Sequence, residues 1–387
     1  MKILTVTWTI YEKSLPEFSD NRTGGGLVIW NLCKEIAKSE QSYLLTLKDN
    51  MEEEHIDNVI ILQNFLGPKQ TLSSEREKRI RERIDIRTAS FEHIIKYLKP
   101  DVVNFQGMGE ISIECMKICE AAHQKYVYTE HLFIRQNVGY CGEETTYQLQ
   151  NVLYNKHNLN IVAISSGMKK SILQDYPNIN SNNIMVIPNG TDFKAKIADS
   201  NIIEKYHIEG KKILICAGSI CYRKNQIGLV ESFATMTTDQ KNKIAIIFLG
   251  NDRLKGALEE KIRMLGLGNS LIYAGAVSND AMKEYYSIAD GLIMPSFAEG
   301  LSIAALEMIA YGKPVIMFSD SECADDLNDK SVVCFAKQRT SQALVEAIGR
   351  WSVTEWDEDY IKKFSLKFTM DRVREDYLSY YRRIIEQ

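Results

Sequence analysis

Short apolar runs alternate with longer amphipathic stretches along most of this chain. The runs are rich in Val, Ile and Leu, as buried β-strands are, and their alternation with helical patterns is typical of parallel βα units. A first series of strands is expected at Ile3–Trp8, Tyr43–Leu47, Val59–Leu62, Val102–Phe105, Tyr126–Thr129, Ile161–Ile164 and Ile184–Ile187. A second series is expected at Ile213–Ala217, Ile244–Leu249, Leu271–Ala274, Gly291–Met294, Val315–Phe318 and Val332–Phe335.

The two series predict an α/β protein with two doubly wound parallel sheets. Between them, Pro188 and the pair Asn189-Gly190 mark a turn, and a polar stretch with little periodicity follows to about Ile203. We therefore place the domains at residues 1–195 and 196–367. Residues 368–387 read as one helix, and periodicity alone does not assign that helix to either sheet.

The composition is that of a globular protein without a strong overall field. The 387 residues are 45% hydrophobic and 25% charged, which suggests two or three domains and excludes disordered and fibrous classes. The formal net charge is −4, so binding of nucleic acid through bulk charge is not expected. One helical segment, residues 75–87, holds six Arg or Lys and four Asp or Glu. It is either a solvated helix face or a contact with an anionic membrane surface or acceptor.

Targeting, membrane and metal patterns do not stand out. The N-terminus reads directly as a strand, and no stretch approaches the length of a membrane span, so a cytoplasmic protein, or one peripheral at the inner membrane face, is expected. The eight cysteines stand singly and the six histidines share no ligand spacing. We expect reduced core thiols and no metal site.

Open α/β sheets bind ligands beyond the carboxyl ends of their strands, so the loops after the expected strands are the candidate sites. The first such loop leads from Ile3–Trp8 to Gly24-Gly25-Gly26 and a helical pattern. Glycine amides in front of a helix N-terminus can approach an anionic group closely. A flexible connector is the alternative interpretation.

The second loop follows Ile213–Ala217 and carries the adjacent cations Arg223 and Lys224 just before a helix that starts near Ile227. An Arg beside a Lys at this place could neutralise a diphosphate, whereas an exposed, solvated pair is the alternative.

The third loop carries Glu299 and leads into a small-residue helix from about Ser302 to Tyr311 that Gly312 and Pro314 close. Glu307 then lies roughly 7.5 Å into the helix if Ser302 is the N-cap. Two carboxylates so placed could bind hydroxyls at two points of one ligand. Otherwise Glu299 complements the helix dipole and Glu307 is a surface residue.

These loops together resemble glycosyltransferase family 4, the retaining, nucleotide-sugar-dependent enzymes of GT-B fold. The family hallmark is two Glu separated by seven residues in an E-G…L-E…A-x-G-x-P-V context, which residues 299–315 match. The resemblance covers nearly the whole chain, through Gly24–Gly26, Tyr128–His131, Ile164–Ser166, Ile187–Asp192, Gly218–Lys224, Ala274-Gly275 and Tyr286–Asp290. It implies two Rossmann-like domains facing across a cleft, with a C-terminal helix able to cross back to the first.

The resemblance also implies roles for individual residues. Glu307 is expected to bind the ribose hydroxyls, Glu299 a hydroxyl of the donor sugar, and Lys224 the diphosphate, with His131 near the donor sugar. The implied catalytic residues are His131, Glu299 and Lys224. The implied donor-binding residues are Gly25, Gly26, Gly218, Arg223, Lys224, Val277, Glu299, Gly300, Leu301, Ser302 and Glu307.

One residue departs from the family pattern at the expected diphosphate site. Many family members have an arginine directly after the glycine of the second loop, where this chain has Ser219, so Arg223 is our candidate for the second cation. No Asp-x-Asp occurs in a loop after an expected strand. We therefore expect the diphosphate to be neutralised by Lys224, Arg223 and helix-end amides, with no metal and no cofactor.

The implied activity is retaining transfer of a hexose or N-acetylhexosamine from a nucleotide diphosphate sugar, with UDP favoured, to an acceptor hydroxyl. A glycan, a lipid-linked intermediate or a protein fits as acceptor, in cell-surface polysaccharide or glycoconjugate synthesis. Two alternatives are a GT-B sugar-nucleotide epimerase and a catalytically silent nucleotide-sugar-binding subunit. The spacing of the two glutamates argues against the first, and the joint presence of Glu299, Glu307, Lys224 and His131 against the second.

Overall fold

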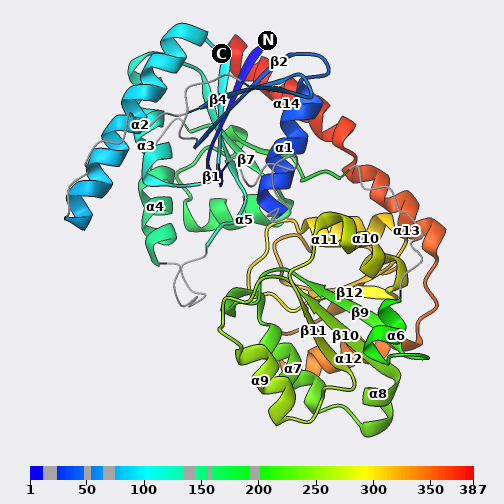
Figure 1. Ribbon diagram of the computed structural model, residues 1–387. Helices are drawn as coiled ribbons and strands as arrows, with labels where there is room; N and C mark the ends of the chain where they lie inside the picture. The colour runs from blue at the N-terminus through cyan, green and yellow to red at the C-terminus, as the bar shows by residue number, and fades with distance from the viewer. Residues whose placement is uncertain (12–23, 48–53, 64–74, 135–143, 156–158, 192–200) are drawn as a thin grey trace.

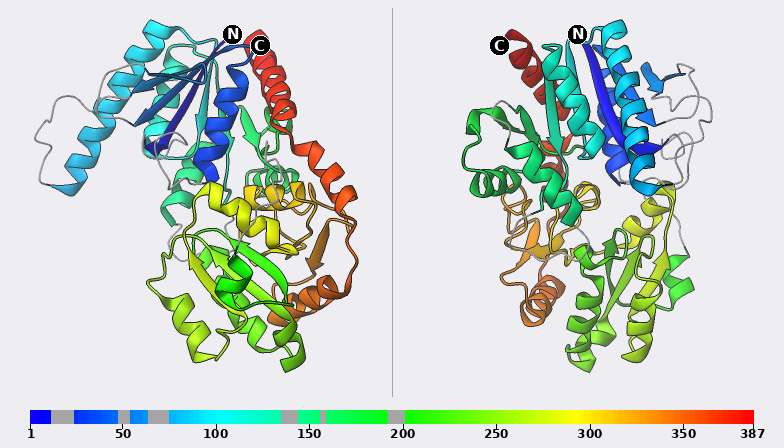
Figure 2. Two further views of the ribbon diagram at one scale, coloured as in Figure 1. Left: turned by 45° about the vertical axis from the view of Figure 1, so that its right-hand side comes forward. Right: turned by 90° about the vertical axis from the view of Figure 1, so that its left-hand side faces the viewer.

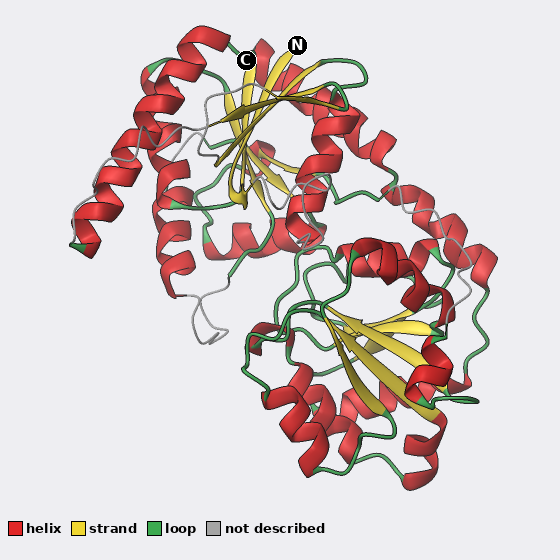
Figure 3. Cartoon of the chain, in the orientation of Figure 1, coloured by secondary structure: helices red, strands yellow, loops and turns green. Residues whose placement is uncertain are grey.

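The computed structural model describes residues 1–11, 24–47, 54–63, 75–134, 144–155, 159–191 and 201–387, and it folds into two α/β domains, each built on a central sheet (Figures 1 and 3). The predicted boundary between residues 195 and 196 falls within 192–200, outside the described residues, and stays a prediction. The change from one sheet to the other lies between Val186 and Lys212.

The first sheet has the order β3-β4-β2-β1-β5-β6-β7-β8. Its strands are β1 (Lys2–Tyr11), β2 (Gln41–Leu47), β3 (Glu54–Ile56), β4 (Val59–Gln63), β5 (Val102–Gln106), β6 (Tyr126–Glu130), β7 (Ile161–Ala163) and β8 (Ile184–Val186). All seven strands of the predicted first series are present, within a few residues at their ends.

Strand β3 was missed from the sequence, and it pairs antiparallel with β4, so the first sheet is not wholly parallel. Its three residues, Glu54-His55-Ile56, contain a single aliphatic side chain and lie at the edge of the sheet. A run this short and polar carries no periodicity that could be recognised.

The second sheet is wholly parallel and has the order β11-β10-β9-β12-β13-β14. Its strands are β9 (Lys212–Ala217), β10 (Ile244–Leu249), β11 (Leu271–Gly275), β12 (Gly291–Met294), β13 (Val315–Phe318) and β14 (Val333–Ala336). In each sheet the chain starts near the middle, winds to one side and then continues on the other, which is the doubly wound arrangement with a ligand crevice at the switch point.

Helices cover both faces of the first sheet because successive strand residues point to opposite sides. Leu4 packs with Phe91 and Met116 on the face covered by α2 (Arg76–Leu98) and α3 (Glu110–Ala121). Ile3 packs on the other face with helices α1 (Gly24–Ile36) and α14 (Met370–Glu386). The remaining helices of this domain are α4 (Glu144–Tyr154) and α5 (Ser166–Asp175).

The second domain is layered in the same way. Its helices are α6 (Ile202–Tyr206), α7 (Gln226–Ala234), α8 (Thr238–Lys243), α9 (Ala257–Met264), α10 (Asn279–Ile288), α11 (Ile303–Ala310), α12 (Ser341–Val353) and α13 (Glu358–Ser365). Helices α7, α9 and α12 bury one apolar face of the sheet, and α10 and α11 bury the other.

The C-terminal helix α14 belongs spatially to the first domain. After α13, the chain leaves the second domain, and α14 runs beside α1, bringing the C-terminus near the N-terminus (Figures 1 and 2). Its buried side chains, including Tyr377, Tyr380 and Tyr381, pack on Val102, Val127 and Val162 of the first sheet. Tertiary packing therefore assigns this helix to the first sheet, which helical periodicity could not do.

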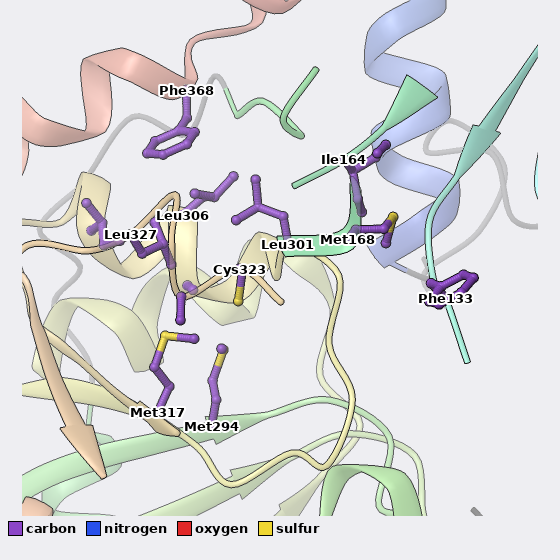
Figure 4. Close-up of a cluster of buried hydrophobic side chains, with 14 of the residues drawn as sticks. Phe133, Ile164, Met168, Met294, Leu301, Leu306, Met317, Cys323, Leu327 and Phe368 are labelled. Atoms are coloured by element: carbon purple, nitrogen blue, oxygen red, sulfur yellow. The ribbon is translucent and has the colours of Figure 1, made fainter. Parts of the chain in front are cut away.

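Apolar side chains of both domains meet beneath the cleft. Ile164 and Met168 come from the first domain and lie to one side of Leu301, with Leu306 and Leu327 of the second domain on the other (Figure 4). Polar contacts flank this cluster: Asp326 accepts hydrogen bonds from the backbone N–H and the hydroxyl of Ser166, each at 2.8 Å. The domains are thus joined by packing as well as by the chain.

The other sequence-based expectations fall on described residues except at Cys141 and His157. Six of the seven described cysteines are buried and all seven are free thiols, whereas Cys141 lies outside the described residues. The charged segment 75–87 forms the N-cap and first turns of α2; residues 77–90 are exposed or half-buried, and burial on that helix begins at Phe91. Over the described part of the chain, no helix is long and apolar enough to cross a membrane.

Candidate functional site

A cavity of about 420 Å³ opens between the two domains, at the carboxyl ends of the central strands of both sheets. The first domain contributes Gly25 and His131 to its wall, and the second domain contributes most of the rest. Of the predicted site residues, Gly25, His131, Gly218, Arg223, Lys224, Val277, Glu299, Gly300, Leu301, Ser302 and Glu307 line this cavity. Gly26, which is buried in the first turn of α1, does not line it.

Glu299 is held by both predicted cations. Its Oε2 lies 2.6 Å from Lys224 Nζ and 3.4 Å from Arg223 Nη1. The two loops are also joined through their backbones: the N–H of Phe297 donates to the Arg223 carbonyl at 2.8 Å, and Arg223 Nη1 donates to the Ala298 carbonyl at 2.8 Å. Residues 75 apart in the sequence thus form one bonded cluster, which the sequence did not predict.

The cations keep Glu299 ionised in spite of its burial. Its side chain is only 13% exposed, and burial by itself raises the pKa of the carboxyl. The charges of Lys224 and Arg223 outweigh that effect, so the pKa of Glu299 is lowered below its usual value. Glu299 is therefore an ionised carboxylate at the cavity wall near neutral pH, with Lys224 as its counter-ion.

Glu307 has the opposite environment. It projects from α11, whose N-cap is Ser302 as predicted, and it is half-buried instead of lying on the surface. Tyr286 donates a hydrogen bond to its Oε2 at 3.1 Å. Burial raises the pKa of Glu307 to about 7, against the opposing effects of Tyr286 and Lys283. This carboxyl can therefore change its protonation state near neutral pH.

His131 follows directly after β6 and faces Gln106 of the neighbouring strand, with 2.6 Å between His131 Nε2 and Gln106 Oε1. Burial lowers the pKa of its imidazole to about 4, so the ring is neutral at physiological pH. The sequence placed His131 at the end of a strand but gave no signal for Gln106.

The two domains touch beside the cavity, at Gly300 and Leu301. A Cβ at Gly300 would lie 2.5 Å from the carbonyl oxygen of His131 and 2.8 Å from Ile164 Cδ1. Asn189 Nδ2 also donates to the Leu301 carbonyl at 2.9 Å across the same boundary. The loop after Glu299 can approach His131 this closely because residue 300 has no side chain.

Arg253 is a cavity-lining cation that sequence reasoning missed. It follows β10, in a turn bonded to the second loop: Ile220 N–H donates to the Asn251 carbonyl at 2.8 Å, and Arg253 N–H donates to the Ile220 carbonyl at 3.0 Å. Arg253 therefore lies beside the turn in which Ser219 stands. No motif marks it, because its relation to the cavity depends on the pairing of two loops.

The arrangement suits an anionic ligand that also carries hydroxyl groups. Arg223, Lys224 and Arg253, with the N-terminus of α11, offer positive charge, while Glu299 and Glu307 offer acceptors for hydroxyls at two separate points. Within the described residues, His, Cys, Asp and Glu side chains do not gather in threes as a metal site would require.

Comparison with known proteins relates this cavity to a family. Residues 199–364, most of the second domain, match the family model described as glycosyl transferases group 1. An uncharacterised glycosyltransferase of Methanocaldococcus jannaschii is 20% identical over 418 aligned positions, covering 100% of this chain and 99% of the relative. The alpha-monoglucosyldiacylglycerol synthase of Streptococcus pneumoniae is 23% identical, covering 66% of this chain and 60% of the relative.

Solved structures agree over the full length. The sucrose-phosphate synthase of Thermosynechococcus elongatus superposes with a TM-score of 0.77 at 16% identity, covering 99% of each chain. The Anabaena protein HepE, solved in complex with UDP and glucose, superposes with a TM-score of 0.73 at 15% identity, covering 98% of this chain and 99% of HepE. The likeness confirms the predicted GT-B fold, and residues 199–364 are similar to the glycosyl transferases of group 1.

Proposed function

We propose that this protein is a retaining glycosyltransferase that transfers a hexose or N-acetylhexosamine from a UDP-sugar to an acceptor hydroxyl. The observation that carries the proposal is the gathering of Glu299, Glu307 and Lys224 from the second domain, and His131 from the first, around one cavity. The HepE structures contain UDP with glucose, and UDP-glucose, which favours UDP as the nucleotide.

The diphosphate is the leaving group, so its developing charge must be stabilised for the glycosidic bond to break. We assign this task to Lys224 and Arg223, with Arg253 and the N-terminal amides of α11 in support. Lys224 Nζ donates to Glu299, and a phosphate oxygen can share this group because it has three donors. We propose that the charges of these three arginine and lysine side chains neutralise the diphosphate without a divalent metal.

The two glutamates then bind different parts of the donor. Glu307, within α11, accepts hydrogen bonds from the ribose hydroxyls, and Glu299, beside the cations, accepts one from the sugar. Val277, with the preceding residues of the turn after β11, lines the cavity where the base is proposed to lie, held largely by backbone groups.

His131 approaches the donor sugar from the first domain, which also supplies the acceptor side of the cleft. Retention of configuration requires the acceptor to attack from the face that the diphosphate leaves, and we propose that a leaving phosphate oxygen takes the proton of the acceptor hydroxyl. A short-lived covalent intermediate is the alternative mechanism. We propose that closure of the domains, at the boundary where Gly300 lies against His131, brings the reacting groups together.

The names of several relatives point to acceptors in the cell envelope. One relative is the synthase named above, and others are named as a putative teichuronic acid biosynthesis glycosyltransferase of Bacillus subtilis and a lipopolysaccharide N-acetylglucosaminetransferase of Salmonella typhimurium. We therefore propose a glycan or lipid-linked acceptor used at the cytoplasmic face of a membrane.

The proposal is tested by thermal shift with UDP, GDP, ADP and their sugars, each with magnesium and with EDTA. A ligand that binds only the native state raises the melting temperature. We expect a selective rise with a UDP-sugar that EDTA does not abolish, and UDP release when acceptors are added. Nuclear magnetic resonance of the product then gives its anomeric configuration.

Variants distinguish the proposal from its alternatives. Lys224→Ala should abolish the shift, whereas the exposed Lys337→Ala in the same domain should not alter it. Nucleotide binding without any transfer would favour the silent subunit, and interconversion of two UDP-sugars without acceptor would favour the epimerase. An inverted product would refute the retaining mechanism.

A further inference from the structure

A chain of buried polar side chains runs from the C-terminal helix to His131. It passes from Tyr381 of α14 through Asn104, Thr129 and Gln106 of the first sheet, and ends at the imidazole. Apart from His131, its members are at most 1% exposed. Buried polar side chains in an apolar layer are costly unless they are bonded to one another, so their placement here needs a reason.

The fold brings these residues together on one face of the sheet. Asn104 and Gln106 are two residues apart on β5 and point to the same side, and Thr129 of β6 is the register partner of Gln106. Helix α14 covers this face with Tyr377 and Tyr381, one turn apart, and the Tyr377 hydroxyl lies 3.4 Å from Thr129 Oγ1.

In this series of hydrogen-bonded side chains, each donor points toward Tyr381. Asn104 Nδ2 donates to the Tyr381 hydroxyl at 2.6 Å, which turns Asn104 Oδ1 toward Thr129, whose hydroxyl donates to it at 3.0 Å. Thr129 Oγ1 then accepts from Gln106 Nε2 at 3.3 Å. This leaves Gln106 Oε1, which carries no hydrogen, facing His131 Nε2 at 2.6 Å. Only a protonated Nε2 can make that contact.

We propose that Gln106 is a positioning residue that fixes His131 in the tautomer protonated at Nε2, and that α14 sets this tautomer through Tyr381, Asn104 and Thr129. The ring is neutral near pH 7, so protonation at Nε2 leaves Nδ1 with a free lone pair. An amide has one donor end and one acceptor end. The opposite tautomer would therefore require both Asn104 and Gln106 to rotate together.

The consequence for catalysis rests on the proposed function of His131 at the donor sugar. A histidine with a fixed tautomer presents a constant hydrogen-bonding character to the ligand, whereas a mixture of tautomers leaves only part of the molecules competent. The C-terminal helix would then contribute to turnover through this series of hydrogen-bonded side chains, although it carries none of the residues that line the cavity.

Tyr381→Phe is the primary test, and Tyr380→Phe is its matched control. Both tyrosines are fully buried on α14, but the Tyr380 hydroxyl donates to the backbone carbonyls of Ile161 and Asn183, outside the polar chain, and the Arg383 guanidinium lies over its ring. Each variant removes one buried hydroxyl from the same helix, so their effects on stability are comparable. Gln106→Met removes the acceptor for His131, and Gln106→Glu keeps it.

The readout is the pair of ring-nitrogen chemical shifts of His131 in full-length protein labelled with 15N-histidine and free of ligand, assigned with His131→Gln. We expect a protonated Nε2 and an unprotonated Nδ1 in the natural protein, in Tyr380→Phe and in Gln106→Glu. We expect mixed tautomers in Tyr381→Phe and Gln106→Met. Protonation at Nδ1 in the natural protein, or equal shifts in the two tyrosine variants, would overturn the proposal.

Turnover is measured separately. Once a donor has been identified, Tyr381→Phe should lower kcat by about ten-fold with little change in the donor KM. Tyr380→Phe should leave kcat and KM unchanged. Because the chemical shifts require no substrate, a protein with the expected tautomer and no transferase activity would refute the proposed function alone. An active protein whose tautomer does not depend on Tyr381 would refute the positioning role alone.

Discussion

Glu307 is predicted to limit the stability of the second domain while it binds the donor. Its carboxyl is half-buried on α11, and Tyr286 is the side chain that donates a hydrogen bond to its Oε2. A glutamine at this position keeps an oxygen that can accept from Tyr286 but carries no charge. Glu307→Gln should therefore stabilise the fold, most strongly above neutral pH, and weaken nucleotide binding.

The size of the effect follows from the pKa of the folded state. Burial raises the pKa of Glu307 from 4.5 to about 7. Each unit corresponds to about 1.4 kcal/mol, so keeping the ionised carboxylate in the folded protein costs up to about 3 kcal/mol. When folding raises the pKa of an acid, the free energy of unfolding is highest at a pH below the pKa of the unfolded state. It falls as the pH rises through the pKa of the folded state.

The stabilisation by Glu307→Gln should therefore grow from about 1 kcal/mol at pH 5 to about 3 kcal/mol at pH 8. The assay is urea unfolding of both proteins at intervals across this range, with Glu355→Gln as control because Glu355 is exposed in the same domain. A difference between Glu307→Gln and the natural protein that stays constant from pH 5 to pH 8 would refute the reasoning.

Binding provides the second half of this prediction. Ribose hydroxyls donate best to an ionised acceptor, so UDP affinity should fall as the pH drops below 7 and should fall about ten-fold in Glu307→Gln at pH 8. Isothermal titration calorimetry measures both effects. Equal UDP affinity in the variant and the natural protein at pH 8 would place the nucleotide elsewhere.

Three further predictions concern the cleft. Lys224→Ala should raise the donor KM and lower kcat, since the diphosphate is present in the ground and transition states; steady-state kinetics test this, and unaltered kinetics would move the phosphate site. Arg253→Ala should raise the donor KM about ten-fold and leave the melting temperature unchanged, because the residue is exposed; an unchanged KM would remove Arg253 from the site. Gly300→Ala should cost about 1–3 kcal/mol of stability and lower kcat, because its Cβ would lie 2.5 Å from the His131 carbonyl oxygen. Gly268 has open space around it, so the control Gly268→Ala should change neither the stability nor kcat.

Much of the fold could be predicted from local sequence. Buried parallel strands are short, continuous and aliphatic, so each of the thirteen expected runs forms a strand. The turn from Met294 to the helix at Ile303 was also readable, because the N-cap Ser302 and the closing Gly312 are local signals. Edge strand β3 was not predicted, since its pairing with β4 compensates for a weak pattern.

The candidate site was predictable as a set of residues but not as an arrangement. The resemblance selected Glu299, Lys224 and His131, and the cavity brings them together. It assigned no partner to Glu299 and no role to Arg253. The ion pair of Glu299 with Lys224 and the approach of Arg253 depend on how loops after different strands pack.

The division between sequence and tertiary structure is clearest in α14. Its amphipathic pattern determined that residues 368–387 would be largely helical, because periodicity is a property of neighbouring residues. The packing of that helix on the first sheet, and the hydrogen bond between Tyr381 and Asn104, 277 residues away, were decided by tertiary structure. A contact between distant residues has no local signature, because its free energy depends on both partners being placed by the whole fold.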